Sequence, residues 1–223
     1  MSTYRVEGPS GFGLKGRIHA PLPIVPESVP PRPHRRPWAL LLASVLLSLG
    51  AWQLASASWI HAKALIAQKL IAYSWERGRD SGLTGRPWPS ADTRAIARLT
   101  VPSRDVDLFV LEGASGRSLA FGPGHVSGTA RPGSWGNSVI VAHRDTHFAF
   151  LRNLALGDEI VVESAPSAVA RYRVREVTVV DKGETRMLDA ADEAQLTLIT
   201  CYPFDAVRPG TTQRYVVIAE RVA

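Results

Sequence analysis

The sequence predicts an all-β domain, either a closed barrel or a sandwich, that follows a single membrane-spanning helix. About 130 residues at the C-terminal end contain seven or eight short runs rich in Val, Ile, Leu and Tyr, separated by Gly, Pro and Asp. One uncharged apolar run of 23 residues precedes them. The 223 residues are 45% hydrophobic and 21% charged, a globular composition that excludes collagen, a long coiled coil and full-length disorder.

Residues 1–37 predict a disordered, Pro-rich tail on the cytoplasmic side. They hold eight of the sixteen prolines, and proline lacks the backbone N–H that helices and sheets require. They also carry six Lys or Arg against two Glu, so most of the net charge of +6 lies in the tail. No basic stripe with interleaved aromatic residues marks the rest of the chain, and no nucleic-acid partner is expected.

Residues 38–60 predict a transmembrane anchor. A helix of this length spans roughly 35 Å at about 1.5 Å per residue, enough for a bilayer core of about 30 Å. Arg32, Arg35 and Arg36 precede it, so the positive-inside rule places the N-terminus in the cytoplasm. The expected location is the inner (cytoplasmic) membrane, with a single pass and the folded domain on the periplasmic or extracytoplasmic side. A signal peptide cut near residues 55–57 is the alternative.

Residues 61–90 predict a helix and a linker, and residues 91–223 predict the β-domain. Apolar residues recur at helical spacing within 61–79, and Gly and Pro residues follow. The candidate strands are 95–101, 106–111, 138–143, 158–163, 170–180, 195–201 and 214–222. The run 170–180 alternates cleanly, which is typical of a strand with one packed and one solvated face. A short helical turn is expected around 147–154.

Cys201 is the residue that points most directly to chemistry. It is the only cysteine, so no internal disulfide can form, and beyond the anchor it would face an oxidising compartment. It ends an apolar strand and precedes Tyr202 and Pro203, a position that exposes a side chain at the rim of a barrel. From composition alone, a buried structural cysteine explains it equally well.

A nucleophilic cysteine needs a base or a charged partner. The histidines beyond the anchor are His61, His125, His143 and His147. His143 ends a strand like that of Cys201, and Arg214 opens the last strand thirteen residues after the cysteine. An arginine there would stabilise a thiolate, or bind a substrate carbonyl and the oxyanion that forms on attack. A solvated arginine on an edge strand is the alternative from the residues alone.

These motifs resemble those of the sortase family. TLITC at residues 197–201 matches the TLxTC signature, and GNSVIVAH at residues 136–143 resembles the strand that carries the sortase histidine. Arg214 stands where the family's arginine is expected. The stretch 106–150 is similar to the subclass of Gram-negative bacteria, class GN. The resemblance covers about residues 60–223.

The resemblance implies an eight-stranded sortase-type β-barrel with short helices, and a transpeptidase reaction. Cys201 would attack the threonine carbonyl of an LPxTG-like C-terminal sorting signal, form a thioester and transfer the acyl group to an amine acceptor. His143 would act as general acid and base, and Arg214 would stabilise substrate and oxyanion. Thr200 would add a weaker oxyanion contact. Neither a cofactor nor a metal is expected.

Two alternatives stay open, one enzymatic and one non-enzymatic. A cysteine protease with the same thioester would hydrolyse it, with water in place of the amine. A binding module on an anchored β-barrel would use Cys201 only structurally. A thiol-reactive probe separates these two classes, because only an enzyme needs an accessible thiolate in the folded state.

Other motifs near His143 are weaker. His143 and His147 stand four residues apart, as zinc ligands can on a helix, but Arg144 replaces the glutamate of HExxH and His143 ends a strand. His-Arg-Asp also occurs in kinase catalytic loops, yet the phosphate-binding glycine loop and DFG are missing from the sequence. Asp145 could orient His143, although a solvated residue or turn cap is favoured.

Overall fold

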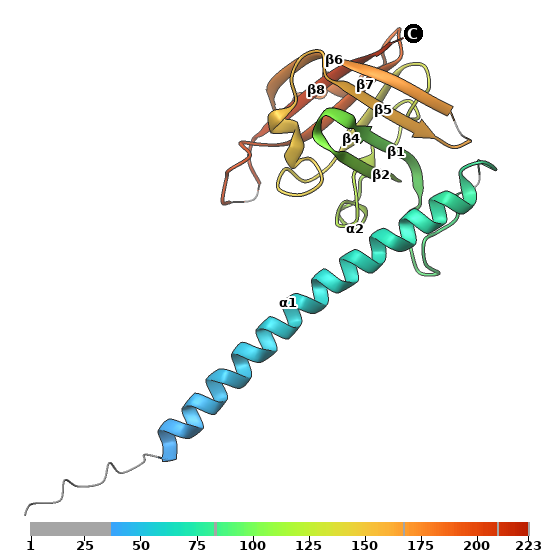
Figure 1. Cartoon of the computed structure of the whole chain (residues 1–223). Helices are drawn as coiled ribbons and strands as arrows, with labels where there is room; N and C mark the ends of the chain where they lie inside the picture. Colours follow the sequence, from blue (N-terminus) through green and yellow to red (C-terminus); the bar gives the residue numbers. More distant parts are fainter. Residues whose placement is uncertain (1–36, 83, 167, 209, 223) are drawn as a thin grey trace, which may run out of the picture. The chain divides into compact units, whose positions relative to one another are not determined.

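Eight strands close on themselves to form the barrel (Figure 1). Along the chain they are β1 (Ala95–Val101), β2 (Val106–Glu112), β3 (Gly124–His125), β4 (Asn137–Val141), β5 (Glu159–Ser164), β6 (Ala168–Asp181), β7 (Gln195–Tyr202) and β8 (Gln213–Val222). Their order around the barrel is β1-β2-β3-β4-β7-β8-β6-β5. The β2–β3 and β4–β7 pairs are parallel and the other pairs antiparallel. This mixed barrel confirms the predicted all-β class.

The computed structural model describes residues 37–82, 84–166, 168–208 and 210–222. Within its long helix, the side chains of residues 37, 39 and 54–65 lie outside the description. All seven predicted strands are present, with ends shifted by at most two residues. The strand that the pattern did not predict is β3, because two residues are too short to show any alternation.

Short helices connect some of the strands. They are η1 (Pro102–Arg104), α2 (Gly116–Leu119), η2 (Ala149–Asn153) and η3 (Arg186–Leu188). The helical turn expected around 147–154 corresponds to η2. Ser115 caps α2, because its hydroxyl accepts a hydrogen bond from the Ser118 backbone N–H.

The helix predicted within 61–79 is the C-terminal part of a longer helix, α1 (Pro37–Gly78). Ile71 and Trp75 are fully buried and lie four residues apart, so they share one face of α1. They pack with Ala95 and Leu111 in a small apolar cluster beside the barrel. Gln68 adds a hydrogen bond from its side-chain amide to the Phe121 carbonyl. This part of α1 is therefore held to the β-domain by apolar burial.

The chain divides into two units, residues 1–49 and residues 50–223. In the first unit, the described large apolar side chains of α1 are exposed: Trp38, Leu40, Leu41, Leu42, Val45, Leu46, Leu47 and Leu49. Among the described residues, no helix is long and apolar enough to cross a membrane. Residues 1–36 of the predicted tail lie outside the described residues, as do the side chains of Pro37 and of residues 39 and 54–60 in the predicted anchor. Both stay predictions.

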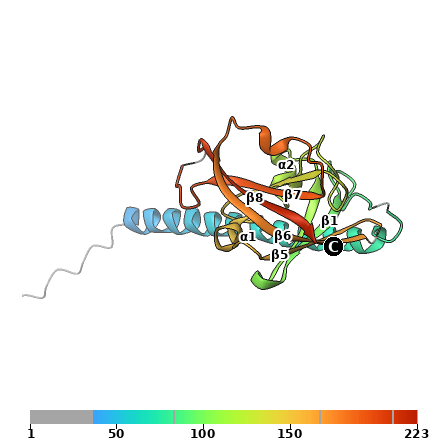
Figure 2. The same ribbon diagram turned by 90° about the horizontal axis from the view of Figure 1, so that it is seen from above.

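The barrel core forms where alternate side chains of the strands point inward. Leu196 and Leu198 of β7 lie in this core with Val217 and Ala219 of β8 and Ile140 of β4. Because side chains alternate along a strand, the residues between them lie on the opposite side, which we call the outer face. Figure 2 shows β7 and β8 side by side, as their ladder requires.

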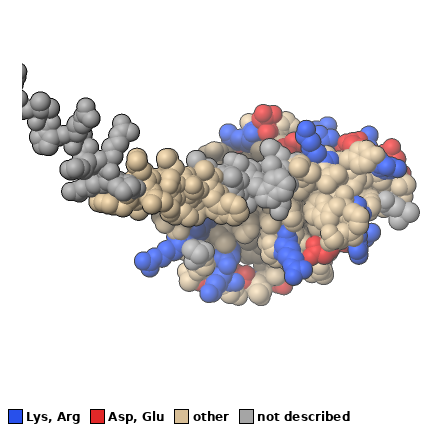
Figure 3. Space-filling view, turned by 90° about the horizontal axis from the view of Figure 1, so that it is seen from below, with Lys and Arg blue, Asp and Glu red and all other residues tan. Residues whose placement is uncertain are grey.

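Charged side chains of both signs are interspersed over the barrel in the view of Figure 3. Arg98 pairs with Asp107 and Arg171 pairs with Glu159, among other exposed ion pairs. Exposed pairs of this kind contribute about 0–1 kcal/mol each, so apolar burial stabilises the barrel far more than they do.

Candidate active site

Cys201 and Arg214 are direct partners in the antiparallel ladder of β7 and β8. Opposite residues in such a pair have their Cβ atoms about 4.5–5.5 Å apart and on the same face of the sheet. Both residues are half-buried. The two predicted residues are thus brought together by strand pairing, although thirteen positions separate them in the sequence.

His143 reaches the same place through the parallel pairing of β4 with β7. Asn137 pairs with Gln195, and Val141 pairs with Ile199. The pairing continues past the end of β4, because the Ala142 N–H donates to the Ile199 carbonyl at 3.3 Å. Continued by one more residue, this register brings His143 level with Cys201. The exposed imidazole therefore stands at the end of β4, beside the cysteine strand.

The three predicted residues share the outer face. On β7 the core residues are Leu196 and Leu198, so Cys201 has the opposite parity. On β8 the core residue Val217 gives Arg214 the opposite parity in the same way. Ile140 and Ala142 lie in the core, which leaves His143 on the outer face. His143, Cys201 and Arg214 form a row across three neighbouring strands.

Two buried threonines fix the register of β4 against β7. The Thr197 hydroxyl donates to Asn137 Oδ1 at 2.7 Å, and the Asn137 amide donates to the carbonyls of Met187 and Asp189 at 3.0 Å. The Thr200 hydroxyl donates to the Ala142 carbonyl at 2.7 Å. Since a slip of one residue would break these bonds and turn every side chain to the other face, they hold His143 beside Cys201.

The Thr200 hydroxyl makes its hydrogen bond inside the barrel. Its side chain is 2% exposed, lies on the core side with Leu198, and gives its only hydroxyl proton to Ala142. A hydroxyl has one proton to donate. This hydroxyl therefore ties β4 to β7, and the predicted oxyanion contact of Thr200 stays a prediction.

The guanidinium of Arg214 is held by the end of the β7–β8 loop. Its Nη1 donates to the carbonyls of Thr211 and Gln213, at 2.8 Å each. A guanidinium carries five N–H donors in a fixed fork. The two bonds through Nη1 orient the group, while Nε and Nη2 carry further donors that can meet a carbonyl oxygen at Cys201.

A cavity of about 360 Å³ borders the site. It is lined by Tyr202, Pro203, Ala206, Arg208, Gly210, Thr211, Thr212 and Gln213. These residues begin directly after Cys201 and end directly before Arg214. The cavity is thus formed by the same hairpin that pairs the cysteine with the arginine.

Three aromatic rings pack beneath this hairpin. Tyr202 stacks on Tyr215 with ring centroids 6.0 Å apart, and Phe204 meets Tyr215 edge-on at 5.0 Å. Burial raises the pKa of Tyr215, and the neighbouring Tyr202 raises it further. Both effects keep the Tyr215 phenol neutral at physiological pH, so this ring supports the hairpin by packing.

The other histidines have different surroundings. His147 is half-buried, and its pKa is lowered by burial and by the neighbouring His143, against the opposing charge of Asp145. His125 is 7% exposed, and its Nε2 lies 2.9 Å from the Ala130 carbonyl and 3.1 Å from the Thr129 hydroxyl. It therefore closes the loop before β4. The side chain of His61 lies outside the described residues.

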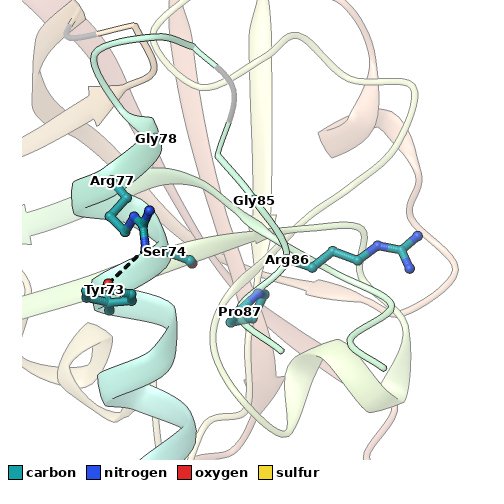
Figure 4. A pocket seen from close by; sticks show the side chains of 7 residues that line it. All are labelled: Tyr73, Ser74, Arg77, Gly78, Gly85, Arg86 and Pro87. Atoms are coloured by element: carbon teal, nitrogen blue, oxygen red, sulfur yellow. Dashed lines mark hydrogen bonds between the residues drawn. The ribbon is translucent and has the colours of Figure 1, made fainter. Parts of the chain in front are cut away.

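Within the described part of the chain, no group of three or more His, Cys, Asp or Glu side chains is placed to hold a metal ion. A second cavity of about 360 Å³ lies between the last turns of α1 and residues 85–87 (Figure 4). There Arg77 donates to the Tyr73 hydroxyl at 2.9 Å, and Arg86 points away from the helix. This cavity contains none of the predicted site residues.

One residue of the site was not predicted. Arg144 follows His143 and reaches across to the β7–β8 loop, where it donates to Ala206, Arg208 and Thr211. The sequence carries no signal for these contacts, because the pairing that brings β4 beside β7 connects segments about sixty residues apart. Its position next to the predicted histidine is the one clue.

Comparison with known proteins agrees with this geometry. The sortase-domain family model matches residues 99–222. The chain is 30% identical over 130 residues to sortase D of Bacillus subtilis (58% of this chain, 65% of the relative). It is 29% identical over 130 residues to sortase A of Listeria monocytogenes (56% of this chain, 55% of the relative). The chain thus spans less than two thirds of the length of these curated relatives.

Solved structures give the same result. A sortase D5 transpeptidase of Clostridium perfringens has a TM-score of 0.52 and 28% identity, with 58% of this chain and 80% of that chain covered. Sortase A of Corynebacterium diphtheriae has a TM-score of 0.53 and 24% identity, with 70% and 84% covered, and supports the fold alone. Since the family model covers more than half of the chain, this protein belongs to the sortase family.

Proposed function

We propose that this protein is a cysteine transpeptidase that cleaves a C-terminal sorting signal at its threonine and transfers the resulting acyl group to an amine acceptor. One observation carries the proposal. Cys201, the arginine paired with it across β7–β8 and the histidine at the end of β4 form a row on one face. A nucleophile, a proton carrier and an oxyanion donor at adjacent positions are the groups that acyl transfer requires.

In the first half of the reaction, the Cys201 sulfur attacks the threonine carbonyl of an LPxTG-like signal. The carbonyl electrons move to oxygen, and N–H donors of Arg214 stabilise the resulting oxyanion. The oxyanion collapses to a thioester as the C–N bond breaks. His143 gives a proton to the departing amine, since an amide nitrogen leaves only when protonated.

In the second half, an amine acceptor attacks the thioester. His143 takes a proton from the amine, a new C–N bond forms, and Cys201 leaves as the thiolate. The thioester keeps the acyl group activated, so cleavage and ligation need no nucleotide. If water attacks instead, the same intermediate is hydrolysed, and the products distinguish the two reactions.

The proposed setting is the inner membrane, with residues 38–60 as a single-pass anchor and the barrel outside the cytoplasm. Support comes from the uncharged run, from Arg32, Arg35 and Arg36 before it, and from the exposed apolar side chains of α1 in the first unit. External protease on spheroplasts should digest the barrel and spare the N-terminal tail. The reverse pattern, or a mature chain that begins near residue 58, would contradict the anchor.

The finer class is also a proposal. The stretch 106–150, with FGPGHVSGTARPG and AHRDTHFAFL, supports class GN of Gram-negative bacteria. The curated relatives are named sortase D and sortase A. The proposal of class GN therefore rests on the motifs within residues 106–150 alone. The proposed substrate is a protein with an LPxTG-like sorting signal, and the proposed acceptor is an amine.

The test is incubation of the full-length protein in detergent with sorting peptides and amines, followed by mass spectrometry. We expect a thioester-linked adduct on Cys201 and an amide product with the amine. The Cys201→Ala variant should keep its fold and lose at least 99% of the activity. Alkylation of Cys201 only after unfolding, without any adduct, would favour the non-enzymatic binding module.

A further inference from the structure

Arg144 connects the histidine strand to the loop that follows the cysteine. Its side chain is half-buried. Nη2 donates to the Ala206 carbonyl at 2.6 Å and to the Arg208 carbonyl at 3.3 Å, and Nη1 donates to the Thr211 hydroxyl at 3.3 Å. All three acceptors belong to the β7–β8 loop, residues 203–212, of which Pro209 is outside the described residues.

Thr211 is shared between the two arginines of the site. Its hydroxyl accepts from Arg144, and its carbonyl accepts from Arg214 Nη1 at 2.8 Å. A connection therefore runs from the residue after His143, through Thr211, to the guanidinium opposite Cys201. It joins the ends of β4 and β8, which are not neighbours in the barrel.

The same loop residues line the cavity beside Cys201. Ala206, Arg208 and Thr211 all border this space of about 360 Å³. Their contacts with Arg144 hold the cavity wall at a fixed distance from the histidine strand. Without this support the loop would keep the Lys182–Thr212 and Arg214–Thr211 hydrogen bonds and the packing of Phe204 on Tyr215. Its middle residues would lose their bonds to Arg144 and would open more easily.

We infer that Arg144 is a positioning residue: it holds the β7–β8 loop in the shape that receives the sorting peptide beside Cys201. This role rests on the proposed function. Its effect is on substrate binding, since Arg144 touches the loop and neither the thiol nor the imidazole is among its contacts. An arginine is needed, because three acceptors on three loop residues match a planar fork and not the single ammonium of lysine.

The test compares Arg144→Gln, Arg144→Lys, Thr211→Val and the Arg144→Gln/Thr211→Val double variant in the full-length protein. For both Arg144 variants we expect KM for a sorting peptide to rise at least about tenfold, with kcat within about threefold of wild type. The KM of the double variant should be no higher than that of Arg144→Gln alone, because Thr211→Val removes a contact that Arg144→Gln has already removed. Arg171→Gln, which removes only an exposed pair with Glu159, is the matched control.

Hydrogen–deuterium exchange measures how well the loop amides are protected, and it needs no substrate. Amides within residues 204–212 should exchange faster in Arg144→Gln, while those of β7 and β8 stay protected. If the wild-type protein turns over no peptide, the proposed function fails and this exchange alone decides whether Arg144 holds the loop. Unchanged KM and unchanged loop exchange would overturn the inference, as would a fall in kcat and in the rate of Cys201 alkylation at constant KM.

Discussion

Cys201 on β7 lies directly opposite Arg214 on β8 in the antiparallel ladder. This pairing, rather than the loop between them, sets the distance from thiol to guanidinium. It also explains the spacing of thirteen residues, since the hairpin must complete a turn before the chain returns beside the cysteine. The parallel neighbour β4 adds His143 from the other side, so one strand, β7, aligns all three groups.

Arg214→Lys should lower kcat/KM at least a hundredfold, although the charge is kept. The Arg214 guanidinium is oriented by the Thr211 and Gln213 carbonyls, and lysine cannot make these bonds and also reach an oxyanion. Loss of one oxyanion donor typically costs about 10²–10³ in rate. Peptide turnover measures the effect, with iodoacetamide labelling of Cys201 as a check on the thiol.

The control for this variant is Arg221→Lys, on the same strand. Arg221 is exposed and donates to the Gly133 carbonyl at 3.3 Å, so turnover should stay near that of wild type. Near wild-type turnover in Arg214→Lys would instead mean that Arg214 is an ordinary strand residue without a role in the reaction.

Thr197→Val should destabilise the protein by about 1–3 kcal/mol, because it leaves the Asn137 side-chain oxygen buried without its donor. Asn137 is 3% exposed and Thr197 is fully buried. Urea denaturation of the variant measures the loss. Thr197→Ser keeps the hydroxyl and should recover most of the stability. Equal midpoints for the valine and wild-type proteins would show that this bond does not fix the register.

Local patterns predicted the strands and the residues at their ends. The run 170–180 alternates between packed and solvated positions, which predicts a strand, and this run forms most of β6 in the barrel. Cys201, His143 and Arg214 could be identified because each stands at a strand end within a recognisable motif. The strand pairings bring these three positions into one row, and their catalytic roles stay predictions.

Long-range pairing could not be predicted in this way. Nothing local in β4 indicates that it runs parallel to β7, and only that pairing turns the Thr200 hydroxyl toward Ala142 and extends Arg144 to the β7–β8 loop. The helix before the domain was predicted in two segments, the anchor 38–60 and a helix within 61–79, and α1 runs through both from Pro37 to Gly78. The part of its apolar face that packs against the barrel is formed by Ile71 and Trp75.

Acidic pH should destabilise the fold through His147. Burial lowers the pKa of His147, and His143 lowers it further. The unfolded chain, with a pKa of about 6.5, therefore takes up this proton first as the pH falls. The free energy of unfolding should decrease from about pH 6.5 downward, toward the folded-state pKa. Urea denaturation at several pH values measures it.

The matched variant for this effect is His147→Gln. It removes the titration and should lose less stability between pH 7.5 and the acid limit than wild type does. If the two proteins lose stability in parallel, other groups cause the acid sensitivity and His147 is solvated like an ordinary surface histidine.

Trp75→Ala should reduce the free energy of unfolding by about 3–5 kcal/mol, as truncations of large buried aromatic residues do. Trp75 is fully buried where α1 meets the barrel, with Phe109 at a centroid distance of 6.3 Å. Tyr73, on the same helix, is 59% exposed. Tyr73→Ala should therefore change stability by no more than about 0.5 kcal/mol. Urea denaturation compares both variants with wild type. Similar small losses for the two would mean that α1 does not share the folding unit of the barrel, whereas the predicted difference would place residues 66–78 of the helix within it.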